Sequence, residues 1–155
     1  RRRLTDAHGK IIDAIADAMA ALAGDGLPFD AGDFARHYYR NVAAEDLVAR
    51  SAGDLAGAAW SHLQFAMQRR RGRPKVRVFN PENNAAAWNS THTIVQTVND
   101  DMPFLVDSVA MLLNAAGFTV HLTVHPILNL LSAGFGIDRG GGSLNRIATP
   151  LNLVQ

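Results

Sequence analysis

The residues best suited to chemistry lie in one short polar turn, between a segment rich in β-branched side chains and a helix-like segment. The turn contains two adjacent carboxylates and a proline. Its residues are Asn99, Asp100, Asp101, Met102, Pro103, Phe104 and Leu105. Because backbone N–H groups at the start of a helix can hold an anion or a carboxylate, this corner is the candidate site for an effector or for contact with a partner.

The same corner also has a purely structural interpretation. Asp101 can cap the following helix while Pro103 presets the backbone of its first turn. Contact with a ligand would then be an additional role of the same residues. A calcium site is not predicted, because two adjacent carboxylates supply far fewer than the roughly 6–8 oxygen ligands that this ion takes.

Two histidines on one predicted strand are a candidate for zinc binding. His121 and His125 share a strand face two pleats apart, about 13 Å by strand rise, whereas each zinc–nitrogen bond is only about 2.0–2.1 Å long. The pair therefore cannot bind one ion on a straight strand, and a polar sheet face or a subunit contact explains it better. The remaining histidines form no pattern with a nucleophile. They are His8, His37, His62 and His92.

A basic segment follows the helix-like first half of the chain. Its cations are Arg69, Arg70, Arg71, Arg73, Lys75 and Arg77. The run from Arg71 to Lys75 resembles an AT-hook core, whose arginines enter the narrow minor groove of A·T-rich DNA. Since the flanking segments have the pattern of ordered elements, an interdomain joint or an electrostatic subunit contact explains the charges better. Nucleic acid is therefore not the expected partner.

The rest of the sequence offers no catalytic, cofactor-binding or metal site. The absence of cysteine excludes disulfides, cysteine nucleophiles and thiolate metal sites. The glycine-rich segment 134–142 lacks the strand, G-x-G-x-x-G and helix order of a dinucleotide site, and is expected to be a flexible loop. Lys10 and Lys75 have no pocket-like context for catalysis.

Composition places the chain among globular proteins. Of its 155 residues, 48% are hydrophobic and 19% charged, and the net charge of +1 predicts no general attraction to nucleic acid or to a membrane. No apolar run approaches the roughly 20 residues of a membrane span. The lack of cysteine and of a signal peptide suits the cytoplasm. Because the chain begins at Arg1, it is expected to be part of a longer protein.

The first seventy residues have the pattern of helices. Residues 4–23 have apolar side chains at helical spacing, and glycines follow them. A short helix is expected after Asp30 or Asp33, another turn or two from Glu45, and a longer helix from Ser51 or Asp54. Residues 1–70 are therefore predicted to form a helical segment.

Beyond the basic joint the pattern changes to strands around one helix. Short strands are expected near Val76 and over residues 91–98, followed by a helix from about Leu105 that Gly117 ends. A further strand run covers 118–130. The fold class is therefore α+β, with a βαβ unit in residues 71–130 and a Gly-rich irregular tail in 131–155. The strands could be parallel neighbours or flank a third in a ferredoxin-like sheet.

Three blocks of sequence carry a resemblance to a known family. They are residues 76–81 (VRVFNP), 94–109 (IVQTVNDDMPFLVDSV) and 117–126 (GFTVHLTVHP), and the likeness extends from about Phe34 to Leu128. In these blocks the chain resembles the N-terminal region of the large bacterial NAD-dependent glutamate dehydrogenases.

This resemblance implies a helical segment followed by ACT-like modules of ferredoxin-like topology. It also implies a parent enzyme that converts L-glutamate, NAD and water to 2-oxoglutarate, ammonium and NADH, with the NAD-binding catalytic domain outside this chain. A typical ACT corner has glycine directly after the proline, which lets the backbone approach an amino-acid effector. Here Phe104 stands in that place.

Three hypotheses follow. The first is a non-catalytic regulatory or oligomerisation segment of an NAD-specific glutamate dehydrogenase, which contacts other domains or subunits in a homo-oligomer. The second is a stand-alone amino-acid-sensing module whose corner holds a carboxylate near Asp101 to Leu105. The third is nucleic-acid binding through the basic segment, tested by salt-sensitive shifts of A·T-rich duplex.

Overall fold

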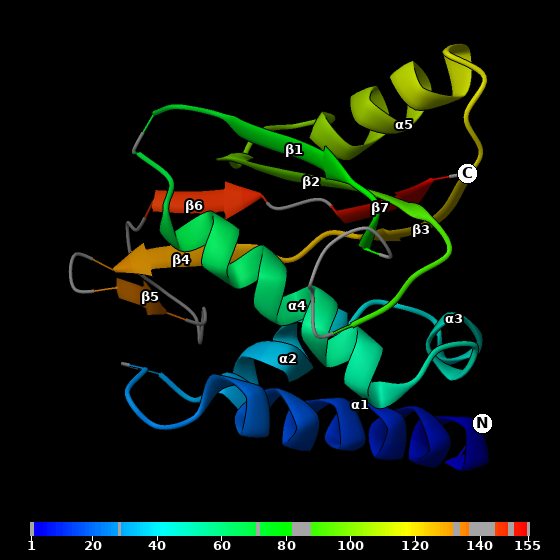
Figure 1. Ribbon diagram of the computed structural model, residues 1–155, viewed down its shortest axis with the longest axis vertical. Helices are drawn as coiled ribbons and strands as arrows, with labels where there is room; N and C mark the ends of the chain where they lie inside the picture. The colour runs from blue at the N-terminus through cyan, green and yellow to red at the C-terminus, as the bar shows by residue number, and fades with distance from the viewer. Residues whose placement is uncertain are drawn as a thin grey trace.

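A computed structural model describes residues 2–27, 29–70, 72–81, 88–131, 134–136, 145–148 and 151–154, with side chains described between residues 6 and 127. Helices and a sheet form successive layers, with α1 and α2 below the strands and α5 above them (Figure 1). The α+β fold class predicted from the sequence is confirmed.

The first part of the chain consists of the predicted helices. They are α1 (Arg2–Ala23), α2 (Ala31–Tyr39), α3 (Ala44–Val48) and α4 (Ala52–Met67). Their starts follow local signals, because the Asp30 side chain accepts a hydrogen bond from the Asp33 N–H and the Ser51 side chain accepts one from the Asp54 N–H. Each cap satisfies a backbone donor that the helix itself leaves free.

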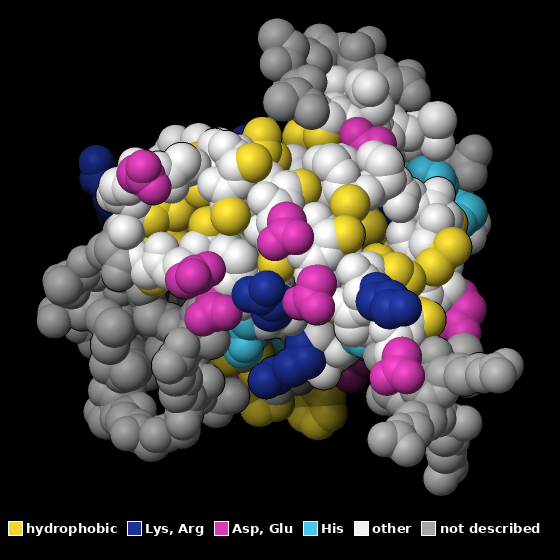
Figure 2. All heavy atoms as spheres, turned by 90° about the horizontal axis from the view of Figure 1, so that it is seen from below, with side chains coloured by type: hydrophobic (Ala, Val, Ile, Leu, Met, Phe, Trp, Pro, Cys, Tyr) yellow, Lys and Arg dark blue, Asp and Glu magenta, His cyan; other side chains and the backbone are white. Residues whose placement is uncertain are grey.

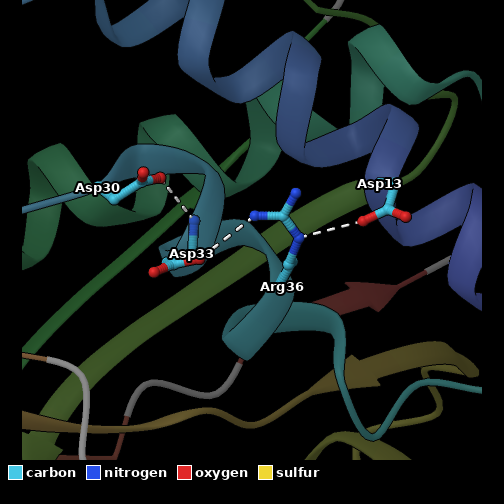
Figure 3. Close-up of polar contacts among 4 residues, drawn as sticks. All are labelled: Asp13, Asp30, Asp33 and Arg36. Carbon is cyan, nitrogen blue, oxygen red and sulfur yellow. Dashed lines mark hydrogen bonds and ion pairs between the residues drawn. The ribbon is translucent and has the colours of Figure 1, made fainter.

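An arginine joins α1 to α2 at the surface. The Arg36 guanidinium lies 3.1 Å from the Asp13 carboxylate of α1 and 3.2 Å from that of Asp33 on its own helix (Figure 3). The hydrogen bond and charge of Asp13 raise the pKa of Arg36. Because all three side chains are well exposed, solvent screens the pairs and they add little to stability.

Seen from below, the helical face shows acidic and basic side chains next to one another among apolar ones (Figure 2). Among the described residues, this face therefore carries no extended patch of one charge sign. Such a mixed surface is typical of a solvated helical layer.

The sheet contains the predicted βαβ unit. β2 (Thr93–Asp100) is followed by α5 (Leu105–Ala115) and β3 (Val120–Val124), and β7 (Leu151–Val154) lies antiparallel to both strands and between them. Of the two arrangements left open by the sequence, β2 and β3 thus flank a third strand, as in a ferredoxin-like sheet. β1 (Lys75–Phe79) pairs antiparallel with β2.

In the segment 131–155, expected to be an irregular tail, the described residues form strands. β5 (Gly134–Gly136) and β6 (Asn145–Ala148) each pair antiparallel with β4 (Ile127–Leu131), and β6 also pairs with the end of β2. Backbone hydrogen bonds make these strands, and such bonds require no alternating side-chain pattern. Most of the expected glycine-rich loop, residues 137–142, lies outside the described residues.

The predicted strand run over residues 118–130 is divided in two. β3 ends at Val124 and β4 begins at Ile127, so His125 and Pro126 form the link between them. Pro126 has no N–H to donate to a sheet, which explains the break. Leu122 and Val124 lie on the buried face of β3.

The helices and the sheet share one hydrophobic core. Ile15 and Met19 of α1, Leu63 of α4, Ile94 of β2 and Val124 of β3 belong to the same buried cluster. The change from helices to strands falls between Met67 and Lys75, within the predicted joint. The core nevertheless continues across it.

α5 is covered much less than the other helices. None of its described side chains is buried, and Met111 and Leu112 are 72% and 71% exposed. Of the apolar side chains along this predicted helix, those of Val109 and Leu113 are only half-buried. The side of α5 that faces away from the sheet is left to solvent.

Candidate functional site

The structure places the predicted corner between the end of β2 and the start of α5. Asn99 and Asp100 are the last residues of β2, and Leu105 is the first residue of α5. The residues between them form the turn. The strand, corner and helix expected from the sequence are thus present, and the corner lies at the surface with Met102 and Phe104 exposed.

The helix start differs from the prediction. Phe104, rather than Asp101, is the N-cap of α5, and no side chain makes a capping hydrogen bond there. Phe104 adopts a left-handed backbone with φ of 62°, and it is the only residue other than glycine with positive φ among those described. Such a conformation favours glycine. Phe104 thus has the backbone geometry expected of the glycine whose place it takes in the ACT-like corner.

An ion pair anchors the corner to the basic joint. The Asp100 carboxylate lies 2.6 Å from the Arg69 guanidinium, whose side chain is only 2% exposed. The Arg69 Nε also donates to the Arg73 carbonyl oxygen. Asn99 Nδ2 lies 3.8 Å from the Met102 sulfur across the turn. Asp100 therefore links the end of β2 to the basic joint.

A cavity of about 360 Å³ lies beside the corner. Val106 of α5 contributes to its wall, together with the end of α2 and the link between β3 and β4. At this wall His37 Nε2 lies 2.8 Å from the Ile127 carbonyl oxygen. Arg40, exposed at the end of α2, also lines the cavity.

His125 is the most unusual group in this cavity. Its Nε2 is buried and has no hydrogen-bond partner among the described residues. Burial lowers the pKa of His125, and the charge of the Asp101 carboxylate opposes this shift. Asp101 is thus electrostatically coupled to the cavity, so the fold brings the corner and a histidine from the far end of β3 together.

The other histidines have separate environments. The His121 ring lies 4.7 Å from that of His92, just before β2, and so His121 does not pair with His125. Among the described residues, no three histidine, aspartate or glutamate side chains come together as a metal site.

His62 belongs to the core. Its Nδ1 lies 2.7 Å from the Tyr38 hydroxyl and its Nε2 lies 3.2 Å from the Thr97 carbonyl oxygen. Burial lowers the pKa of His62 to about 4. The ring is therefore neutral at neutral pH, so Nε2–H donates to Thr97 and Nδ1 accepts from Tyr38. This network ties α2 and α4 to β2.

Several cations of the basic segment make contacts within the protein. Arg77 donates to Gln96 and Ser61, and its guanidinium lies over the rings of Phe65 and Phe79. Lys75 donates to the Phe65 carbonyl oxygen and the Gln68 side chain. Together with Arg69, these residues fasten β1 and the joint to α4 and β2, which supports the interpretation as a joint. Arg71 lies outside the described residues.

A second and larger cavity was not foreseen. It measures about 430 Å³ and lies between the start of α4 and the segment that leads into β2. Arg50, Trp88 and His92 line it. Sequence reasoning missed it because these residues lie far apart along the chain and no local motif links them. The same is true of Arg40 and His125 in the cavity beside the corner.

Among the helices within the described ranges, none combines the length and the apolar character that a membrane crossing requires.

Comparison with known proteins identifies the family. The family described as glutamate dehydrogenase, ACT1 domain, matches residues 34–132. The chain is 45% identical over 95 residues to the NAD-specific glutamate dehydrogenase of Halomonas elongata, covering 61% of this chain and 6% of that protein. It is 35% identical over 103 residues to the NAD-specific glutamate dehydrogenase of Pseudomonas aeruginosa, covering 66% of this chain and 6% of that protein.

No solved structure matches the chain. The chain spans about 6% of the length of these curated relatives, and the matched region contains the corner and most of the sheet. On the strength of the match over residues 34–132, the chain belongs to the glutamate dehydrogenase ACT1 domain family.

Proposed function

We propose that this chain is a non-catalytic regulatory and assembly segment of an NAD-specific glutamate dehydrogenase. The observation that carries the proposal is the ACT1 domain match over residues 34–132, which includes the corner and the cavity beside it. In this proposal NAD binding and the conversion of L-glutamate to 2-oxoglutarate belong to other parts of the parent enzyme. The parent enzyme would act in the cytoplasm.

The structural roles of the charged residues support a non-catalytic role. Lys75 is held by Phe65 and Gln68, while Arg69 and Arg77 are occupied by hydrogen bonds to the joint, α4 and β2. The purified chain should therefore produce no NADH from L-glutamate and NAD. Measurable turnover that survives repurification would defeat this part of the proposal.

The face of α5 supports the assembly role, and we propose a second copy of this chain as its occupant. Phe104 is 76% exposed, and Met111 and Leu112 extend the apolar surface along the helix. Asp107 is the only charged residue of α5. Two copies can therefore face each other across a twofold axis with little like-charge repulsion, as an isologous dimer requires.

Sedimentation velocity tests this dimer with two matched charge insertions. Leu112→Glu should convert the dimer to a monomer, because it places a carboxylate in the apolar contact. Val48→Glu, at a residue of α3 whose side chain is about as exposed as that of Leu112, should leave the dimer intact. A chain that is monomeric at all accessible concentrations, or a dimer that Leu112→Glu does not affect, would contradict the assembly role.

The cavity beside the corner favours a second candidate function, an amino-acid-sensing module. Arg40 could pair with the carboxylate of an amino acid, and the unpartnered Nε2 of His125 could hydrogen-bond to it. Titration calorimetry with a panel of amino acids tests this function. Heat that disappears in Arg40→Gln would support it, and uniformly absent heat would count against it.

A further inference from the structure

The cavity at the start of α4, which we call the α4 cavity, lies apart from the corner. Its wall is built by the end of α2, the link between α3 and α4, the first half of α4, the segment 88–92 and β3. A volume of about 430 Å³ falls within the usual range of small-molecule sites, roughly 300–1,000 Å³. Elements that are distant in sequence thus enclose one space of ligand size.

Hydrogen bonds hold the wall of the α4 cavity in place. Asp54 accepts a hydrogen bond from the Ser51 hydroxyl, at 2.7 Å, and from the Asn89 N–H, at 2.9 Å. Both carboxylate oxygens therefore have partners within the protein. The two bonds tie the segment 88–92 to the first turn of α4, so the cavity is largely pre-formed.

Trp88 gives the cavity a rigid apolar side. The Trp88 side chain is buried and packs directly on Gly57 of α4, where a methyl group would overlap it. Its ring meets that of Phe79 edge to face at 6.1 Å. Leu55, Ala58 and Leu122 complete the apolar lining. This part of the cavity suits an apolar group of a ligand.

The lining of the cavity also includes a cation without a described carboxylate partner. Arg50 donates to the Asp46 carbonyl oxygen at 2.6 Å, and no described carboxylate lies within ion-pair distance of its guanidinium. His92 lies close enough to interact electrostatically with the Arg50 guanidinium. Burial lowers the pKa of His92, and the positive charges of His121 and Arg50 lower it further. Arg50 is therefore the only full positive charge among the described residues of the lining.

We propose that the α4 cavity binds a small organic monocarboxylate that carries an apolar group. The planar guanidinium of Arg50 would pair with the carboxylate, to which it can present two parallel N–H donors. Ser90 and Thr91 line the same cavity, and the Ser90 hydroxyl, which accepts from the His92 N–H, keeps its own O–H to donate. The Asp54 carboxylate disfavours a doubly charged phosphate, because only one full positive charge opposes it.

Phenylacetate is a suitable probe, because it joins one carboxylate to one apolar ring. Proton–nitrogen correlation spectra of this chain should show saturable shifts of the Trp88 indole N–H and of the amides of residues 88–92. Trp60, which does not line the cavity, provides an internal reference. Phenylacetamide, of the same shape without the charge, and phenyl phosphate, with a second charge, should bind at least about tenfold more weakly.

Substitutions of arginine separate specific from general charge effects. Arg50→Gln should weaken phenylacetate binding by about tenfold or more, since it removes a charge-assisted hydrogen bond. Arg50→Lys keeps the charge and loses the planar guanidinium. Its affinity for phenylacetate should therefore lie between that of the unchanged chain and that of Arg50→Gln. Arg70→Gln, at an exposed site outside the cavity, should bind as the unchanged chain does.

Three results would overturn the proposal. They are the absence of saturable shifts at residues 88–92, equal binding of phenylacetate and phenylacetamide, and unchanged affinity in Arg50→Gln. The dispersion of the same spectra shows whether each variant is folded. Shifts confined to residues 99–106 would point to the corner instead and would also overturn the assignment to the α4 cavity.

Discussion

At the scale of single residues, the buried position of His62 in the core determines its protonation state. His62 is buried between the Tyr38 hydroxyl and the Thr97 carbonyl oxygen, and the loss of solvation on burial lowers its pKa and keeps the ring neutral at neutral pH. His92 and His125 are only partly enclosed, and both line cavities. Sequence alone does not distinguish these histidines, because the difference comes from residues that are distant along the chain.

The depressed pKa of His62 predicts a specific pH dependence of stability. Its pKa is about 4 in the folded chain and about 6.5 in the unfolded chain, so the unfolded state binds more protons between these values. Stability is therefore full above pH 6.5 and decreases as the pH falls. Between pH 7 and 5, His62 alone should lower the free energy of unfolding by about 2 kcal/mol.

Urea unfolding at a series of pH values measures this effect. His62→Gln should flatten the decrease, whatever its effect on stability at neutral pH. Val48→Ala, at an exposed site without an ionisable side chain, should leave the slope as it is. A His62→Gln variant with the same pH dependence as the unchanged chain would show that His62 is not the group that titrates.

At the scale of elements, local signals predict where most helices begin. Ser51 and Asp30 cap α4 and α2 as expected, because the cap hydrogen bond involves residues only three positions apart. The start of α5 was mispredicted, since its N-cap depends on the left-handed backbone of Phe104 and on no side-chain cap. β6 and β7 were missed because pairing with β2 over a long sequence separation makes them strands.

The same contrast between local and long-range contacts explains which parts of the candidate site could be predicted. The corner was predictable because its strand, turn and helix are consecutive in the sequence. The two cavities were not, since each needs the tertiary packing of helices against the sheet.

The left-handed backbone of Phe104 predicts that glycine at this position gives a more stable protein than alanine. A residue with a side chain at φ near 62° is strained by roughly 1–2 kcal/mol, and the greater flexibility of unfolded glycine offsets part of the relief. Phe104→Gly should therefore be about 0.5–1 kcal/mol more stable than Phe104→Ala. Both variants lose the exposed ring, so their difference isolates the backbone.

Thermal unfolding of the two variants gives this difference. A matched substitution in the middle of α5, Ala110→Gly, should have the opposite sign and cost about 1 kcal/mol, because its backbone is helical. Greater stability of Phe104→Ala than of Phe104→Gly would mean that position 104 is not left-handed in solution.

At the scale of the whole molecule, the helical layer and the ACT-like sheet depend on each other. α2 and α4 lie on one face of the sheet, and α1 packs on the far side of these two helices (Figure 1). The buried residues of the three helices form one cluster with Ile94 and Val124. A lone βαβ unit buries little, so the helices supply most of the cover for this face. The opposite face, with α5, keeps the exposed apolar residues of the proposed assembly surface.

This shared core predicts that the chain unfolds as one unit. Ile94 is fully buried between β2 and the helices, so Ile94→Ala should cost about 2–5 kcal/mol through lost burial and a cavity. Helical circular dichroism and the fluorescence of Trp88, measured in a Trp60→Phe background, should shift together to lower denaturant. Val78→Ala, at an exposed position of β1, should change the free energy of unfolding by less than about 0.5 kcal/mol. Because the helices and the sheet bury the same side chains, a helical transition that stayed in place while the fluorescence transition moved would show that the two layers fold separately.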